Sequence, residues 1–157
     1  DIRKYKALGV LGDSIFEREL WTINKNNLSR AVAIGLFWGW MPMFFQMIPA
    51  AFCAVYFRAN LPLSLAGVWV SNPITMPPMM YLGYEFGNII LGIDPLFQKF
   101  EASIEWISSV FSLIWQPLLA GTMIIGIASA ILGYFGIHLI WKFIAYRKLR
   151  KIKANTK

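Results

Sequence analysis

The sequence has few of the residues that build enzyme sites and metal centres. Its 157 residues include a single cysteine, Cys53, and a single histidine, His138. These counts exclude an intrachain disulfide and a metal centre with several histidine ligands. The chain also lacks a glycine-rich phosphate loop and an acidic cluster suited to a divalent metal. We therefore expect a protein that is not an enzyme, with no catalytic residue, metal or cofactor.

Charged residues are scarce as well, and they are unevenly distributed. They make up 15% of the chain, whereas soluble domains average about 25%, and the mean hydropathy is +0.54. Six of the fifteen Lys and Arg residues lie in residues 1–30 and seven in 142–157, while Lys99 is the only base from Asn60 through Trp141. Bases that flank apolar runs are typical of the positive-inside rule and of contact with anionic headgroups. The net charge of +7 therefore predicts membrane lipids as partners, and no nucleic acid.

Long uncharged stretches predict an all-α integral membrane protein. The first, residues 31–57, is 27 residues long, whereas about 20 residues span a bilayer core. Gly39 and Pro42 interrupt it near its middle. The segment is therefore either one kinked, tilted span or a helical hairpin that turns at residues 39–42 and leaves on the side where it entered.

A proline-rich break divides the second uncharged stretch, residues 61–84. The break, residues 69–78, holds three prolines together with Ser71, Asn72 and Thr75. Each proline removes a backbone donor and costs about 3 kcal/mol in a helix interior. We predict a broken helix here, followed by a new helix over about residues 78–92. Irregular backbone at membrane depth must be covered by protein or line a wet cavity, so the break should face inward.

The C-terminal part predicts a transmembrane helix over residues 118–141. Pro117 should separate it from an amphipathic interfacial helix over residues 97–115. Near the other end, Ser14 and Glu17 have the spacing of a capping box, which predicts a short helix through Trp21 at the membrane surface or against the loops.

These segments divide the chain into three parts. Residues 1–30 form a cytoplasmic or interfacial segment, residues 31–141 the membrane domain with its Pro-broken or re-entrant helices, and residues 142–157 a basic cytoplasmic tail. Because bases are concentrated in both terminal parts, both termini should lie in the cytoplasm. This arrangement requires an even number of crossings, such as two full crossings plus re-entrant elements.

Glu85 is the first candidate functional residue, because a carboxylate within a membrane is costly and is usually paired, protonated or functional. Arg58 is its expected ion-pair partner, and Tyr81, one turn earlier, is an expected hydrogen-bond partner. The pair either holds the two arms of the protein together or serves a ligand.

The helix start after the break is the second candidate. The first turn of a helix presents unpaired N–H groups and the positive end of the dipole, which favour an anion such as a phosphate headgroup. Alternatively, the polar side chains of the break only cap that helix. Gln46 either cross-links the apolar arms or faces a cavity. The predicted ligand-binding set is Gln46, Arg58, Asn60, Ser71, Asn72, Thr75, Tyr81 and Glu85.

Small residues recur at a four-residue spacing in the last apolar stretch. Gly126 and Ala130 form one such pair, and Ser129 and Gly133 form another. This spacing allows another helix to approach closely, so it predicts a contact with a membrane-protein partner or a second copy of the chain. Glycine is also common in membrane helices for other reasons, which leaves both interpretations open.

A set of polar, proline and glycine positions resembles the bacterial membrane family catalogued as domain of unknown function 2062. The resemblance covers about residues 29–140. It rests on Gly39, Pro42, Gln46, Arg58, Asn60, Pro62, Asn72, Pro73, Thr75, Pro78, Tyr81, Tyr84 and Gly87. Phe45 departs from the pattern, which has a glycine before the glutamine. The resemblance implies a small inner-membrane protein with a shared core, and it implies no mechanism.

Two functional hypotheses follow. In the first, the protein binds, and in an extended form of the hypothesis translocates, an anionic or lipid-linked headgroup in envelope biogenesis. In the second, it is a non-catalytic scaffold or assembly subunit of a larger membrane complex.

Overall fold

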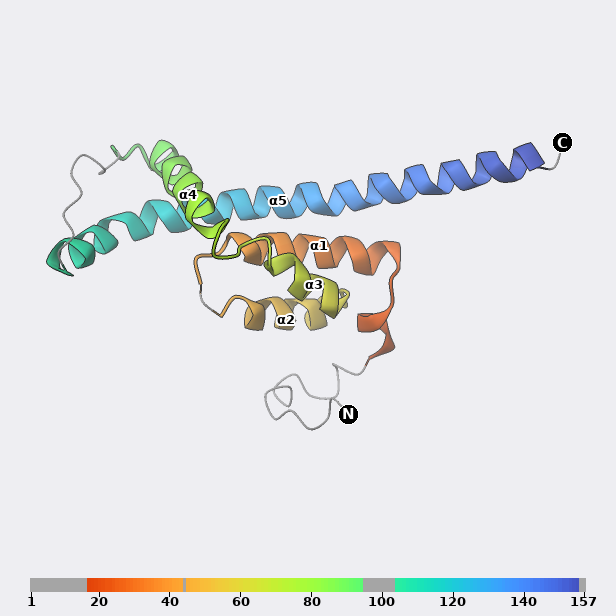
Figure 1. Ribbon diagram of the computed structural model, residues 1–157, viewed down its shortest axis with the longest axis horizontal. Coiled ribbons are helices and arrows are strands. Elements are labelled where there is room, and N and C mark those ends of the chain that lie inside the picture. Colours follow the sequence, from red (N-terminus) through yellow and green to blue (C-terminus); the bar gives the residue numbers. More distant parts are fainter. Residues whose placement is uncertain (1–16, 44, 95–103, 156–157) are drawn as a thin grey trace.

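The computed structural model describes residues 17–43, 45–94 and 104–155, with the side chains of α5 described over residues 114–147 (Figure 1). Within these ranges the protein is entirely helical, without a strand, as predicted. The elements are the 3₁₀ helix η3 (Arg18–Trp21) and the α-helices α1 (Lys25–Trp40), α2 (Met47–Tyr56), α3 (Leu61–Val68), α4 (Met76–Leu91) and α5 (Ile104–Asn155). Ser14, half of the predicted capping box, lies outside the described residues.

The first apolar stretch folds as a helical hairpin, not as a single span. α1 ends where Met41 adopts an extended conformation just before Pro42, and the chain turns before α2 begins at Met47. At the far end, Arg30 Nη1 donates a hydrogen bond of 2.9 Å to the carbonyl oxygen of Phe57. This bond holds the start of α1 beside the end of α2, so residues 31–57 fold back on themselves as the hairpin alternative requires.

α3 runs parallel to α1 from the same end of the molecule. The Asn60 N–H donates to the Asn27 carbonyl at 3.2 Å, and the Asn60 side chain caps α3 by accepting from the Leu63 N–H at 3.0 Å. Further along, the backbones of α1 and α3 touch, because a Cβ on Gly35 would lie 2.7 Å from the Gly67 Cα. α3 ends at Val68, where the predicted break begins.

The helix that follows the break starts two residues earlier than predicted. α4 begins at Met76, so Pro77 and Pro78 occupy its first turn, where their missing N–H groups cost no helical hydrogen bond. α4 ends at Gly92, which adopts a left-handed conformation with φ of 64°. This C-cap geometry is the usual role of glycine after a helix.

The prediction that Pro117 divides the C-terminal region is wrong. α5 is one 52-residue helix with Pro117 in its interior, and the predicted interfacial helix is its first part, apart from residues outside the described range. α4 crosses α5 at this proline, where Gly87 lies against the Pro117 carbonyl (Figure 1). Packing of α4 at this point offsets the hydrogen bond that the proline removes.

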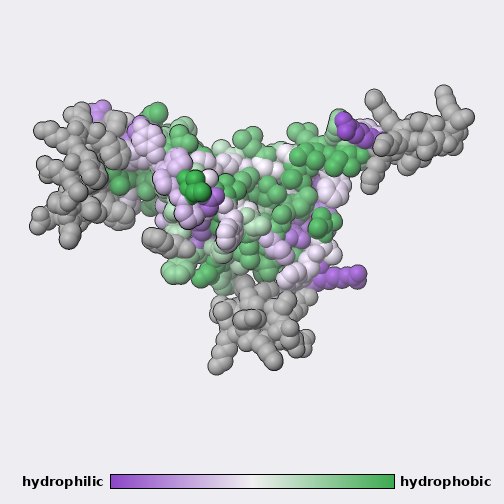
Figure 2. All heavy atoms as spheres, viewed as in Figure 1, coloured by the Kyte–Doolittle hydropathy of each residue, from purple (hydrophilic) through white to green (hydrophobic). Residues whose placement is uncertain are grey.

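Residues 114–147 of α5 are long and apolar enough to cross a membrane, with a mean hydropathy of 2.0 in their most apolar window. Only 6% of that window is fully buried within the protein, so most of its side chains are at least partly accessible at the surface. Figure 2 shows hydrophobic residues over much of the visible surface between the ends of the molecule. A soluble core helix would bury such a surface, whereas a bilayer covers it.

α1 packs along α5 in the opposite direction. Ser29 Oγ lies 3.2 Å from His138 Nε2 near one end of this contact, and Gly126 lies against Phe37 and Trp40 near the other. Beyond the end of α1, α4 takes over the contact with α5 through Gly83 and Gly87.

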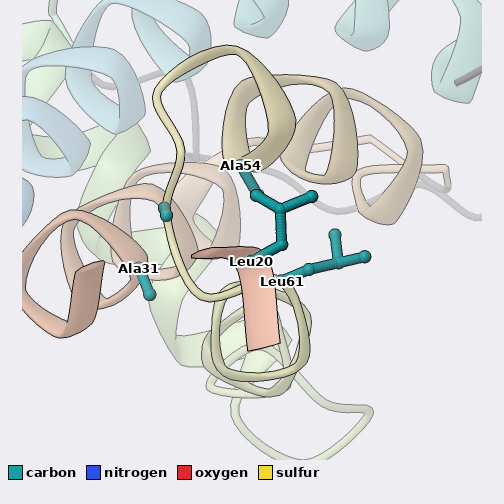
Figure 3. Packing of buried hydrophobic residues seen from close by; sticks show 5 residues of the cluster. Leu20, Ala31, Ala54 and Leu61 are labelled. Atoms are coloured by element: carbon teal, nitrogen blue, oxygen red, sulfur yellow. The ribbon is translucent and has the colours of Figure 1, made fainter. Parts of the chain in front are cut away.

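The buried core is small and lies where η3 meets the first three α-helices. Leu20, Ala31, Ala54 and Leu61 converge there, and Leu20 is fully buried (Figure 3). Residues 17–30 therefore fold together with the helical body, and η3 contributes to its core.

Candidate functional site

The side chain of Gln46 joins the two breaks in the chain. Its amide is oriented by its neighbours: Oε1 accepts a 2.6 Å hydrogen bond from Ser71 Oγ, and Nε2 donates to the carbonyls of Trp38 and Met41 at 2.8 and 2.9 Å. Residues 41–46 and 69–75, far apart in sequence, thus meet through one amide. This is the cross-link between apolar arms that the sequence suggested for Gln46.

The start of α4 does not offer the free N–H groups that we expected for an anion. Asn72 Oδ1 accepts from the Ile74 and Thr75 N–H groups at 2.9 and 3.0 Å, and Thr75 Oγ1 accepts from the Asn72 N–H at 2.9 Å. The Met76 and Met79 N–H groups donate to the carbonyls of Asn72 and Thr75. The remaining positions through 79 are prolines, which have no N–H. Asn72 and Thr75 therefore stabilise the turn that precedes α4, and neither side chain makes a capping hydrogen bond to the helix.

We expect Asn72→Ala to destabilise the protein by about 1 kcal/mol, because the loss of the Asn72 side chain leaves the backbone N–H groups of Ile74 and Thr75 unsatisfied. Asn72→Ser retains a side-chain oxygen that can accept from the same turn, so it should recover part of this stability. Thermal unfolding in detergent measures both variants. Equal stability of Asn72→Ala and the wild type would contradict the role of Asn72 in the turn.

A small pocket adjoins the break but carries no charge. It has a volume of about 240 Å³ and is lined by Gln46, Met47, Val68, Trp69, Ser71, Asn72 and Pro73. Its polar groups suit hydrogen bonding to a neutral group, and no base in its lining could balance a phosphate.

Arg58 and Asn60 lie at the opposite end of α3 from this pocket. Arg58 Nε lies 3.9 Å from Glu17 Oε2. The ion pair that we expected between Arg58 and Glu85 is not formed among the described residues. Asn60 is buried, and its Nδ2 donates to the Thr22 carbonyl at 3.2 Å while its Oδ1 caps α3. Asn60 therefore stabilises the junction of η3, α1 and α3.

Tyr81 and Glu85 form a third location, on α4. No hydrogen bond joins them, and within the described residues Glu85 makes no ion pair. Glu85 is on α4, which packs on α5, whereas Arg58 follows α2 and lies beside Glu17. The eight predicted residues therefore belong to three separate places, and the structure brings only Gln46, Ser71, Asn72 and Thr75 together.

A larger cavity lies at the start of α1, which the sequence analysis did not single out. Its volume is about 460 Å³, and Asn24, Lys25, Asn26, Asn27 and Arg30 line it, so its described lining has two bases and no acid. Asn24 is the N-cap, since its side chain accepts from the Asn27 N–H at 2.9 Å. The three asparagines around Lys25 were the available signal, but a capping pattern alone does not reveal a cavity.

Other bases share this end of the molecule. Lys25 lies one turn before Ser29, and Lys142 one turn after His138, which contacts Ser29. The Arg30–Phe57 hydrogen bond brings Arg58 to the same end. Antiparallel packing of α1 on α5 thus gathers bases from three separate parts of the chain.

The glycines of the four-residue pattern contact α1 of the same chain. A Cβ on Gly126 would meet the Phe37 carbonyl at 3.3 Å, and one on Gly133 would meet Val32 at 2.9 Å. The close helix approach predicted from this spacing therefore occurs within the chain.

Over its described residues this is a small all-helical protein with one candidate membrane-spanning helix and a basic end. The chain belongs to the bacterial family described as "Uncharacterized protein conserved in bacteria (DUF2062)", whose family model matches residues 9–150. This membership confirms the resemblance found in the sequence, and together with the apolar α5 it indicates membrane association. Searches of the curated proteins and of the solved structures gave no match.

Proposed function

We propose that this protein resides in the bacterial inner membrane and binds an anionic or lipid-linked headgroup at its basic end. The observation that carries the proposal is the cavity at the start of α1, where Lys25 and Arg30 are its charged lining residues. The positive end of a 16-residue helix adds to this charge. A phosphate there meets two cations and the amides of neighbouring asparagines.

The chemistry of Arg30 supports this role. One of its guanidinium nitrogens, Nη1, donates to the Phe57 carbonyl, which holds the side chain in place at the hairpin base. A guanidinium has five N–H donors, so further donors are left for a phosphate oxygen. A preorganised arginine loses less side-chain entropy on binding than a free one.

The heights of the helices along α5 support a membrane topology. His138, level with Ser29, and Pro117, level with Gly87, are about 30 Å apart along α5, which matches the thickness of the hydrocarbon core. α3 and α4 together run from the basic end to the level of Pro117 as one broken crossing. α5 runs back to the basic end as the second crossing. The α1–α2 hairpin enters and leaves on the basic side, so both termini are cytoplasmic by the positive-inside rule.

The joined breaks then lie at membrane depth. Gly126, beside Trp40 at the end of α1, is about 18 Å along α5 from His138. The uncharged pocket beside Gln46 and Ser71 thus supplies polar groups beyond the bilayer midplane. Movement of a bound headgroup from the basic cavity towards this pocket is the extended form of the proposal.

We expect the double variant Lys25→Gln, Arg30→Gln to bind phosphatidylglycerol at least about tenfold more weakly. Each base near an anionic surface contributes about 1 kcal/mol. Lipid titration of the detergent-solubilised protein followed by native mass spectrometry measures the change.

The matched control is Arg18→Gln, Arg147→Gln, which removes two exposed bases that do not line the cavity. It should bind phosphatidylglycerol within about twofold of the wild type. Equal losses in the two double variants would show that binding depends on net charge alone, and would contradict a site at α1.

A further inference from the structure

Asn88 is a buried amide whose side chain has no hydrogen-bond partner. It lies on α4 and is only 3% exposed, and neither Nδ2 nor Oδ1 makes a hydrogen bond. A buried unsatisfied amide is destabilising, because it has given up its hydrogen bonds to water without replacing them. Few such groups occur in native proteins, and each calls for an explanation such as a bound molecule.

The position of Asn88 places it in the contact between α4 and α5. The buried positions of α4 are Met79, Gly83, Tyr84, Gly87 and Asn88, which recur at helical spacing along one face. Gly83 and Gly87 on that face touch Thr122 and Pro117 of α5. Pro117 has no N–H for the Leu113 carbonyl one turn earlier, so this crossing loses a helical hydrogen bond as well.

An apolar slot lies along the same crossing. It has a volume of about 200 Å³, and its lining is Met80, Tyr81 and Tyr84 of α4 with Ile114 and Leu118 of α5. Its lining exposes no polar surface. Tyr81 and Tyr84 precede Asn88 by seven and four residues, so the three lie along one face of α4.

We propose that this crossing binds an uncharged amphiphile, with a hydroxyl or ester group hydrogen-bonded to Asn88 and an acyl chain in the slot. The amide supplies one donor and one acceptor, which matches a hydroxyl beside an ester carbonyl. The apolar lining suits a hydrocarbon chain, whose burial is favourable.

The charges near Asn88 favour a neutral ligand. Among the described residues that line the slot there is no base, and Glu85 lies three residues before Asn88 on α4, where its carboxylate repels an anion. This site therefore differs in chemistry from the basic cavity at α1, and its ligand is not the one proposed for that cavity.

Dioleoylglycerol is a suitable probe, because it has a hydroxyl, two ester groups and acyl chains but no phosphate. We expect it to bind the wild-type protein in detergent, measured by native mass spectrometry, and to bind Asn88→Leu about tenfold more weakly. Leucine is similar in size to asparagine and leaves no unsatisfied amide, so the thermal midpoint should be unchanged or higher.

Two further variants complete the experiment. Leu118→Phe partly fills the slot and should also weaken dioleoylglycerol binding, whereas Gln116→Leu, an exposed amide on α5, should bind as the wild type does. The double variant Lys25→Gln, Arg30→Gln should also bind dioleoylglycerol as the wild type does. Failure of the proposal for the slot can therefore be distinguished from failure of the proposal for the basic cavity.

If the wild-type protein did not bind dioleoylglycerol, the proposal would be overturned. The partner of Asn88 would then be a buried water molecule. Equal binding by Asn88→Leu and the wild type would overturn it as well, because the amide would then contribute nothing to the ligand.

Discussion

Gly121→Ala is expected to destabilise the protein by about 3 kcal/mol, the upper end of the range for overpacking. A Cβ on Gly121 would collide with the Gly83 carbonyl oxygen and would lie 2.7 Å from the Gly87 nitrogen. Both obstacles are backbone atoms of α4, so no side chain can rotate away and the helices must separate. Thermal unfolding of the detergent-solubilised protein, followed by circular dichroism, measures the loss.

Gly136→Ala is the matched control for this substitution. It lies in the same helix, and a Cβ at this position would meet nothing within 4 Å. Because alanine favours a helix over glycine by about 1 kcal/mol, this variant should be as stable as the wild type or more stable. If both alanine variants unfolded at the same temperature, the close α4–α5 crossing would be contradicted.

The proposed topology predicts opposite labelling of two single-cysteine variants. In a Cys53→Ala background, Asn26→Cys should react with a membrane-impermeant maleimide only from the cytoplasmic side, and Asp94→Cys only from the opposite side. Asn26 lies at the basic end, and Asp94 follows the end of α4, where the proposed topology has the chain complete its broken crossing. Intact cells and inverted membrane vesicles expose opposite sides of the membrane to the maleimide. Each variant should therefore be labelled almost completely in one preparation and hardly at all in the other.

Met43→Cys, in the turn between α1 and α2, provides the internal control. This residue lies near the tip of the α1–α2 hairpin, which is re-entrant in the proposed topology, so it should react poorly from either side. Reaction of Asn26→Cys and Asp94→Cys from the same side would exclude a crossing by α3 and α4. If Met43→Cys reacted strongly from the side of the membrane opposite to that of Asn26→Cys, α1 and α2 would each cross the whole membrane.

The polar residues of the break have a structural role that fits a membrane environment. Gln46, Asn72 and Thr75 satisfy backbone groups at the two breaks, and Ser71 bonds Gln46. In a bilayer each unsatisfied group would cost several kcal/mol. These four side chains, which the sequence offered as ligand-binding residues or as partners of the break, therefore stabilise the breaks.

Functional candidates instead lie at positions that the sequence did not single out. The basic cavity combines Lys25 and Arg30 with the start of α1, and the Asn88 slot combines α4 with α5. Neither site has a local motif, because each depends on which helix faces meet. Lys25 resembles any base beside an apolar run, and Asn88 resembles any amide in a helix.

The sequence by itself determined the features that depend on a few neighbouring residues. Prolines at 73, 77 and 78 set the break before α4, since a missing N–H acts within one turn, and Gly92 set its end. The segregated charge and the long apolar stretches determined the all-helical class and the apolar C-terminal helix.

Only the tertiary structure decided the features that depend on distant parts of the chain. It formed a hairpin from residues 31–57, placed Glu17 rather than Glu85 beside Arg58, and directed Gly126 and Gly133 towards α1. It also kept α5 continuous through Pro117, where the packed α4 offsets a local cost. The local sequence limits the conformations that a segment can adopt. Packing between helices determines which of these conformations, and which contacts, are formed.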